Sequence, residues 1–146
     1  MATIHNSIEI KAPVSKVFAY IDNPRNEPDW LPSMLEVKNV TGYGVGTHYE
    51  WSWKIGEMRF KGASTKIEHV HDKRIVVKSK GIHGVESKWI YNLKNEGDAT
   101  IFELNIEYLV PTRVLGKSVE HVIMERNKRE ADMGLMNIKK RMEKEV

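Results

Sequence analysis

Cysteine is absent from this chain of 146 residues, and proline, phenylalanine and long apolar runs are scarce. Without cysteine the protein has no disulfide framework, no thiol nucleophile and no cysteine metal site. This composition fits a reducing compartment, and we expect a cytoplasmic protein. No stretch approaches the roughly 18 apolar residues of a membrane span, and residues 1–13 do not resemble a signal peptide.

Charge of one sign is also lacking, since 23 basic and 20 acidic residues give a formal net charge of only +3. The two signs are interleaved, as in EHVIMERNKRE at positions 120–130. Such a weak bias argues against nucleic acid as a partner. An apolar fraction of 40% in a chain of this length predicts a single domain over residues 1–146.

Most of the first hundred residues show the alternating pattern of half-buried strands. Tyr49, Trp51 and Trp53 share one face of such a segment, and Phe102, Leu104, Ile106 and Tyr108 share one face of another. Short turns join neighbouring segments, so we expect antiparallel pairing. The predicted strands cover residues 3–11, 35–40, 47–54, 57–70, 74–80, 85–93 and 99–110.

One strand carries an irregularity. Met58 and Phe60 fall on one face, whereas Ala63 and Ile67 fall on the other. A change of face beside Gly62 predicts a β-bulge there, which would help the sheet to curl.

Helical spacing occurs at both ends of the chain. Residues 13–21 and 26–31 predict two short helices. The proline-free segment from Thr112 to Glu145 predicts one long helix, with a buried stripe at Ala131, Leu135, Ile138 and Met142. Further back, Leu115 and Met124 are apolar and Asn127 falls on the stripe. A core-facing Asn127 needs a hydrogen-bond partner, either a strand residue or a ligand or water in a pocket.

This combination of elements predicts an α+β protein with an internal cavity. A helix about 10–12 Å wide cannot cover a flat sheet of about seven strands, which would be roughly 30 Å across. The sheet must curl around the helix, and a curled sheet leaves space beneath it.

The segments DNPRNEPDWLPS (22–33), LVPTRVLGK (109–117) and GLMNIKKRMEKE (134–145) resemble those of the START-like superfamily, which includes polyketide cyclase/dehydrase and lipid-transport proteins. The resemblance covers essentially the whole chain. It implies a helix-grip fold, in which a curved antiparallel sheet of six to seven strands holds a long C-terminal helix over a hydrophobic cavity. It also implies binding of lipids, quinones or polyketides without a cofactor, with Trp30 near the cavity mouth and Asn127 in its roof.

Motifs for other chemistries are incomplete. His69 and His71 could face one way on a strand, but no further ligand has the spacing of a metal site, so we expect no metal. Gly62-Ala63-Ser64 lacks the second glycine of a nucleophile elbow. The acidic residues Glu50, Glu103 and Glu107 fall on the outward strand faces, and would enter the cavity only if the strand register moved by one residue.

The leading hypothesis is a carrier or sensor of a small hydrophobic molecule. One alternative is a polyketide aromatase/cyclase or dehydratase, with Tyr108 or Glu120 as proton-transferring candidates, and another is a protein-interaction module. The sequence determines neither catalysis nor oligomeric state. The predicted ligand-binding residues are Trp30, Tyr49, Trp51, Phe60, Trp89, Tyr91, Phe102, Leu104, Met124 and Asn127.

Overall fold

The computed structural model describes residues 2–81, 84–111, 113 and 116–144. In chain order the elements are β1 (Ala2–Ile10), α1 (Val14–Asp22), the 3₁₀ turn η1 (Pro24–Asn26), α2 (Glu27–Trp30), β2 (Met34–Thr41), β3 (His48–Ile55), β4 (Met58–Val70), β5 (Arg74–Gly81), β6 (Glu86–Glu96), β7 (Ala99–Leu109) and α4 (Lys117–Lys144).

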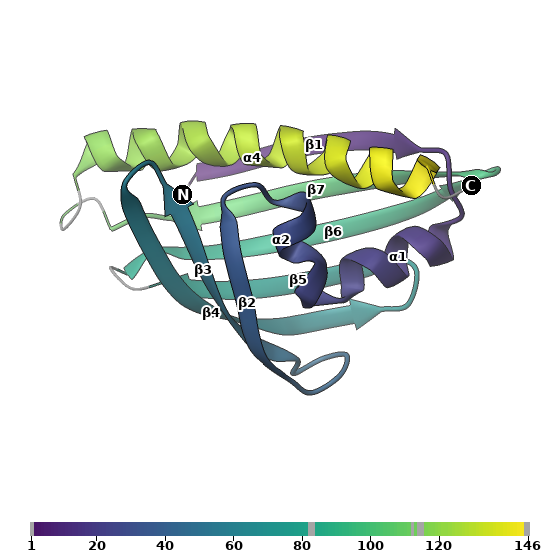
Figure 1. Cartoon of the computed structure of the whole chain (residues 1–146), viewed down its shortest axis with the longest axis horizontal. Coiled ribbons are helices and arrows are strands. Elements are labelled where there is room, and N and C mark those ends of the chain that lie inside the picture. The colour runs from purple at the N-terminus through teal and green to yellow at the C-terminus, as the bar shows by residue number, and fades with distance from the viewer. Residues whose placement is uncertain (1, 82–83, 112, 114–115, 145–146) are drawn as a thin grey trace.

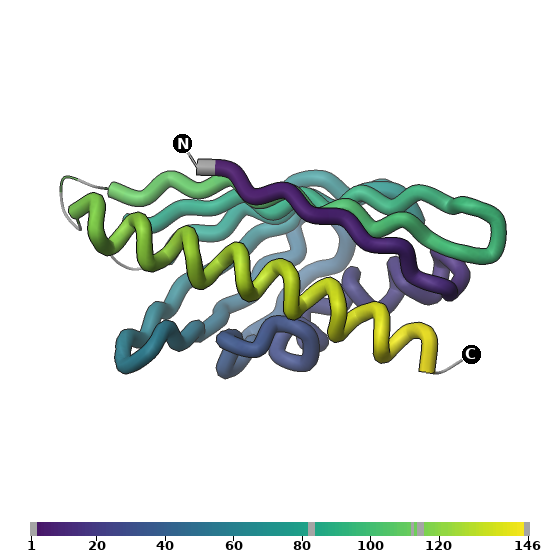
Figure 2. Tube along the Cα trace, turned by 90° about the horizontal axis from the view of Figure 1, so that it is seen from above, coloured from purple at the N-terminus to yellow at the C-terminus, as the bar shows by residue number. Residues whose placement is uncertain are grey.

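The strands form one sheet in the order β1-β7-β6-β5-β4-β3-β2, and every neighbouring pair is antiparallel. Figure 1 shows α4 lying along one face of this sheet, with α1 and α2 on the same side. Seen from above in Figure 2, the sheet curls so that α4 lies between the β1 edge and the tip of the β3–β4 hairpin. The predicted helix-grip fold is therefore confirmed.

The core lies between the sheet and α4. The inward face of β7 presents Phe102, Leu104 and Ile106, all fully buried, as its alternating sequence predicts. The facing stripe of α4 includes Leu135 and Ile138, which are equally buried. Burial of this apolar surface, at roughly 25 cal/mol per Å², is the main force that holds the helix on the sheet.

The predicted bulge at Gly62 is wrong. The buried face of β4 continues through Phe60, Ser64 and Lys66, and the register shift lies between Lys66 and Glu68. Ile67 is therefore 40% exposed, although it is apolar. Lys66 takes an inward position because its ammonium group donates to the backbone oxygen and the carboxylate of Asp22, at the end of α1.

The predicted long helix begins later than expected. The helix α4 starts at Lys117, directly after Gly116, whose φ of 84° is incompatible with a continuous right-handed helix. The predicted apolar position Leu115 and the predicted start at Thr112 lie outside the described residues. Within the described part of the chain, no helix is long and apolar enough to cross a membrane.

Candidate functional site

A cavity of about 80 Å³ lies between α4, the segment around α2 and the inward faces of β3, β4 and β6. An apolar groove of about 150 Å³ adjoins it, between the β3–β4 hairpin and the first turns of α4. The two spaces share Ile55, Phe60 and Ile123 as lining residues. The groove thus extends the cavity toward the outside, at the N-terminal end of α4.

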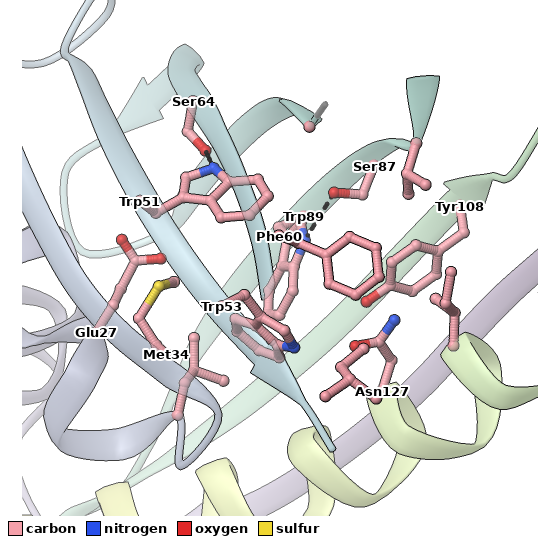
Figure 3. Close-up of a pocket in the computed structure, with 15 residues that line it drawn as sticks. Glu27, Met34, Trp51, Trp53, Phe60, Ser64, Ser87, Trp89, Tyr108 and Asn127 are labelled. Carbon is pink, nitrogen blue, oxygen red and sulfur yellow. Dashed lines mark hydrogen bonds between the residues drawn. The ribbon is translucent and has the colours of Figure 1, made fainter. Parts of the chain in front are cut away.

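Indole rings form much of the cavity wall. Trp51 and Trp53 come from β3 and Trp89 from β6, and the ring of Phe60 lies among them in Figure 3. The N–H groups of Trp51 and Trp89 are already bonded, to the hydroxyl oxygens of Ser64 (3.0 Å) and Ser87 (3.1 Å). These two tryptophans therefore offer ring surface to a ligand rather than hydrogen-bond donors.

Gly62 makes room for one of these rings. A Cβ atom at this position would overlap the ring of Trp51 and the carbonyl oxygen of Lys80, and would lie 2.8 Å from the Cα atom of Gly81. The glycine thus allows the Trp51 ring to approach β4 and β5 closely.

Among the described residues that line the cavity, Glu27 is the one with an ionisable carboxyl group, and its inward position is not predicted from the sequence. Its side chain is only 7% exposed and lies beside Trp51 at one side of the site (Figure 3). A local signal was present, because Trp30 and Leu31 follow Glu27 at helical spacing and both are 1% exposed. A turn that buries those two residues also turns Glu27 inward.

The carboxyl group of Glu27 is incompletely paired. The Oε2 atom is buried with no hydrogen-bond partner among the described residues, and the hydroxyl group of Tyr49 is the polar group near it that favours the charged form. Burial raises the pKa of Glu27 to about 7, although the hydroxyl group of Tyr49 and the charge of Lys66 act in the opposite direction. The same burial, with the nearby charge of Glu27, raises the pKa values of Tyr49 and Tyr91.

A second polar group lies on the opposite side of the cavity. Tyr108 from β7 and Asn127 from α4 are neighbours there in Figure 3, separated from Glu27 by the aromatic rings. The hydroxyl group of Tyr108 is buried and has no hydrogen-bond partner among the described residues. The site is therefore a mostly apolar space with a polar group at each end.

The predicted ligand-binding residues divide into two groups. Trp51, Phe60, Trp89 and Asn127 line the cavity. The others pack around it without reaching it: Trp30, Tyr49, Tyr91, Phe102, Leu104 and Met124. Trp30 packs edge-on to Tyr91 (6.1 Å between ring centroids), and its backbone oxygen accepts a bond from Asn137 of α4. It therefore lies beneath the helix.

The outward acidic residues lie where their strand parity places them. Glu50 accepts a hydrogen bond from Asn39, and Glu103 accepts bonds from Asn92 and Asn105. All three carboxylates, Glu107 included, are partly exposed and none lines the cavity. The acidic residue of the cavity comes instead from α2.

His69 and His71 separate into different environments. His69 lies 3.0 Å from the Oδ1 atom of Asp22, which Lys66 also contacts at 2.5 Å, while His71 is 80% exposed. Burial by itself raises the pKa of Asp22, but the hydrogen bonds from Lys66 and His69 outweigh it and hold that pKa below its usual value. No group of three or more candidate metal ligands occurs among the described residues.

Comparisons with known proteins give one family match and many structures with the same fold. The profile of the family described as "Polyketide cyclase / dehydrase and lipid transport" matches residues 1–143. No curated protein matches the sequence at a significant level.

Solved structures share the fold. TTHA0849 from Thermus thermophilus superimposes with a TM-score of 0.83 at 15% identity, covering 97% of each chain. The Zhui aromatase/cyclase from Streptomyces gives a TM-score of 0.82 at 11% identity, covering 97% of this chain and 93% of that one. A START superfamily protein from Mycobacterium smegmatis gives 0.63 at 13% identity, covering 92% and 98%. Identities this low carry information about the fold alone.

Proposed function

Because the chain belongs to the polyketide cyclase/dehydrase and lipid transport family, we propose that it binds a small hydrophobic molecule between the sheet and α4, as a carrier or sensor. The observation that carries the proposal is the aromatic cavity, lined by Trp51, Trp53, Trp89 and Phe60 and joined to an apolar groove. Ligand sites in proteins are typically apolar spaces of this kind with a few polar groups at fixed places.

The size of the space favours a compact ligand. The cavity measures about 80 Å³ and the adjoining groove about 150 Å³, while an apolar cavity of about 150 Å³ accommodates benzene. A ligand of two fused rings would therefore occupy both the cavity and part of the groove. Larger molecules would require the lining rings to rotate.

Titration with flat aromatic probes and with fatty acids tests the proposal. We expect a saturable change in tryptophan fluorescence, with shifts of the Trp51 and Trp89 indole N–H signals in NMR spectra. Native mass spectrometry of protein from its own host would detect a ligand that co-purifies. The absence of saturable binding by every apolar probe would contradict the proposal.

A matched pair of variants locates the binding. Ile123→Trp fills the space shared by the cavity and the groove, whereas Met133→Trp adds the same side chain to an exposed position of α4. We expect the first variant to lose probe binding and the second to retain it. Equal binding by both would place the ligand elsewhere.

Glu27 favours a second candidate function, an aromatase/cyclase or dehydratase. A general acid or base works best with a pKa near the working pH, and burial brings the pKa of Glu27 to about 7. The carboxylate would take a proton from a carbon next to a carbonyl group. The resulting acid would return that proton to a hydroxyl group, which leaves as water.

The two functions separate in one experiment. If the protein is an enzyme, Glu27→Gln abolishes the dehydration of a polyketide-like β-hydroxyketone and retains binding of the same compound. If the protein is a carrier, the wild type binds such compounds and returns them unchanged.

A further inference from the structure

We infer that the ligand carries a hydrogen-bond donor, either a hydroxyl group on an aromatic ring or an ammonium group joined to such a ring through a methylene, which pairs with the Oε2 atom of Glu27. This inference rests on the proposed function and adds to it the chemical class and the orientation of the ligand. It places the donor group beside α2, and the apolar body between the indoles.

The carboxyl group of Glu27 has one oxygen atom without a hydrogen-bond partner among the described residues. This atom is Oε2, which is buried although the hydroxyl group of Tyr49 lies nearby. A buried carboxylate oxygen without a donor is costly to the protein. A donor on the ligand would remove that cost, so selectivity for donors follows from the unmatched oxygen itself.

The described side chains of the cavity wall near Glu27 leave its Oε2 atom without a donor. The side chain lies beside the ring of Trp51 in a lining that also contains Leu31 and Met34, and these side chains offer no strong donor that could take the place of the ligand. The N–H group of Trp51 is already bonded to Ser64, and the hydroxyl oxygen of Ser64 lies 2.5 Å from that of Ser79. These nearby polar groups of the wall are thus satisfied by one another.

The opposite end of the cavity differs in kind. Tyr108 presents a neutral hydroxyl group and Asn127 a carboxamide, and each can both donate and accept. That end therefore does not discriminate between ligand donors and acceptors. The carboxylate form of Glu27 only accepts, so the donor of an asymmetric ligand belongs at the Glu27 end.

Two probes of closely similar shape test the inference. The hydroxyl group of 2-naphthol is replaced by a methyl group in 2-methylnaphthalene. For each protein we take the preference, which is the affinity for 2-naphthol divided by the affinity for 2-methylnaphthalene, at pH 8. We expect the preference of the wild type to exceed that of Glu27→Met by about tenfold or more, as for a hydrogen bond to a charged group. Glu27→Met keeps the length of the side chain and removes the acceptor. Tryptophan fluorescence supplies both dissociation constants for each protein.

Tyr108→Phe is the control at the other end. It removes the competing hydroxyl group and, on this inference, leaves the preference for naphthol intact. Loss of the preference in Tyr108→Phe, or its persistence in Glu27→Met, would overturn the inference while leaving hydrophobic binding in place. Failure of both probes to bind the wild type would overturn the proposed function as well.

A third probe, 2-naphthylmethylamine, distinguishes the two donors. The groups that face Glu27 are Tyr49 of β3, Lys66 of β4 and Tyr91 of β6, with Lys66 the cation among them. If the natural donor is an ammonium group, the amine binds at least as tightly as naphthol at pH 8 and weakens by about tenfold at pH 5.5, where Glu27 is protonated. If it is a hydroxyl group, the amine binds more weakly than naphthol at both pH values.

Discussion

The buried carboxyl group of Glu27 couples the stability of the protein to pH. Its folded-state pKa of about 7 lies above its ordinary value of 4.5. Between these values the folded protein keeps a proton that the unfolded chain has lost. This difference in proton binding contributes about 3 kcal/mol to the free energy of unfolding. The contribution is fully present below pH 4.5 and is lost as the pH rises through 7.

The variant Glu27→Gln should remove this dependence, because glutamine keeps the shape and does not ionise. We expect its free energy of unfolding, relative to wild type, to improve by about 3 kcal/mol between pH 4.5 and pH 8. Urea unfolding at both pH values measures the difference. A difference that stays constant with pH would mean that Glu27 titrates normally.

Gly62 is a second position where one atom matters. An added methyl group at this position would overlap the Trp51 ring and the carbonyl oxygen of Lys80, and backbone atoms of a sheet cannot move aside cheaply. We expect Gly62→Ala to lower the free energy of unfolding by about 1–3 kcal/mol or more and to shift the Trp51 indole signal in NMR spectra.

Gly81→Ala is the matched control for this substitution. Its added Cβ atom would lie 3.4 Å from the Trp51 ring, which is ordinary contact. We expect a change within about 0.5 kcal/mol. Equal destabilisation by the two variants would mean that the loss of stability comes from strand propensity rather than from the close contact between Gly62 and the Trp51 ring.

Between secondary-structure elements, the buried carboxylate of Glu130 joins α4 to Ser33 in the connection between α2 and β2; we call this pair the Glu130–Ser33 clamp. Glu130 is 6% exposed and accepts from the backbone N–H of Ser33 (3.1 Å) and from its hydroxyl group (2.5 Å). This clamp holds the helix over the segment that carries Glu27 and Trp30. It therefore contributes to the shape of the cavity as well as to stability.

The clamp can be measured with a double-mutant cycle. We expect Glu130→Ala to lower the free energy of unfolding by about 2–4 kcal/mol, because it leaves the half-buried N–H and hydroxyl groups of Ser33 without the carboxylate that accepts from both. Ser33→Ala should cost less, and the coupling energy should be about 1.5–3 kcal/mol. Strictly additive effects of the two changes would show that the pair contributes no interaction energy.

At the scale of the whole molecule, the cavity makes stability depend on occupancy. The side chains around the space under α4 lack packing contacts that a ligand can supply. A ligand that binds only the folded state therefore stabilises the whole folded protein. At one hundred times its dissociation constant, 2-naphthol should add about 2.7 kcal/mol. For a chain of this size the midpoint of thermal unfolding would rise by roughly 5–10 °C.

Differential scanning fluorimetry at increasing probe concentration measures this rise. The midpoint should keep increasing with the logarithm of the concentration above saturation. Ile123→Trp should show no shift, and Met133→Trp should behave as the wild type. A shift that is identical in Ile123→Trp would point to nonspecific binding at the surface.

Local pattern was enough to predict the architecture. Alternation in β7 put Phe102, Leu104 and Ile106 on one face, and helical spacing put Ala131, Leu135 and Ile138 on one stripe. These periodicities depend only on backbone geometry, so the curved sheet, the long helix and the side of each that faces the core could be predicted from the residues in order.

The polar interior was decided by tertiary contacts. Lys66 lies inside because Asp22 ends α1 opposite it, and Gly62 permits close contact with Trp51 rather than forming a bulge. Glu27 acquires its incomplete pairing only where β3 and β4 meet α2. A single segment determines which face is apolar, but the burial cost of a charge depends on partners that distant segments bring to it, and those appear only when the chain is folded.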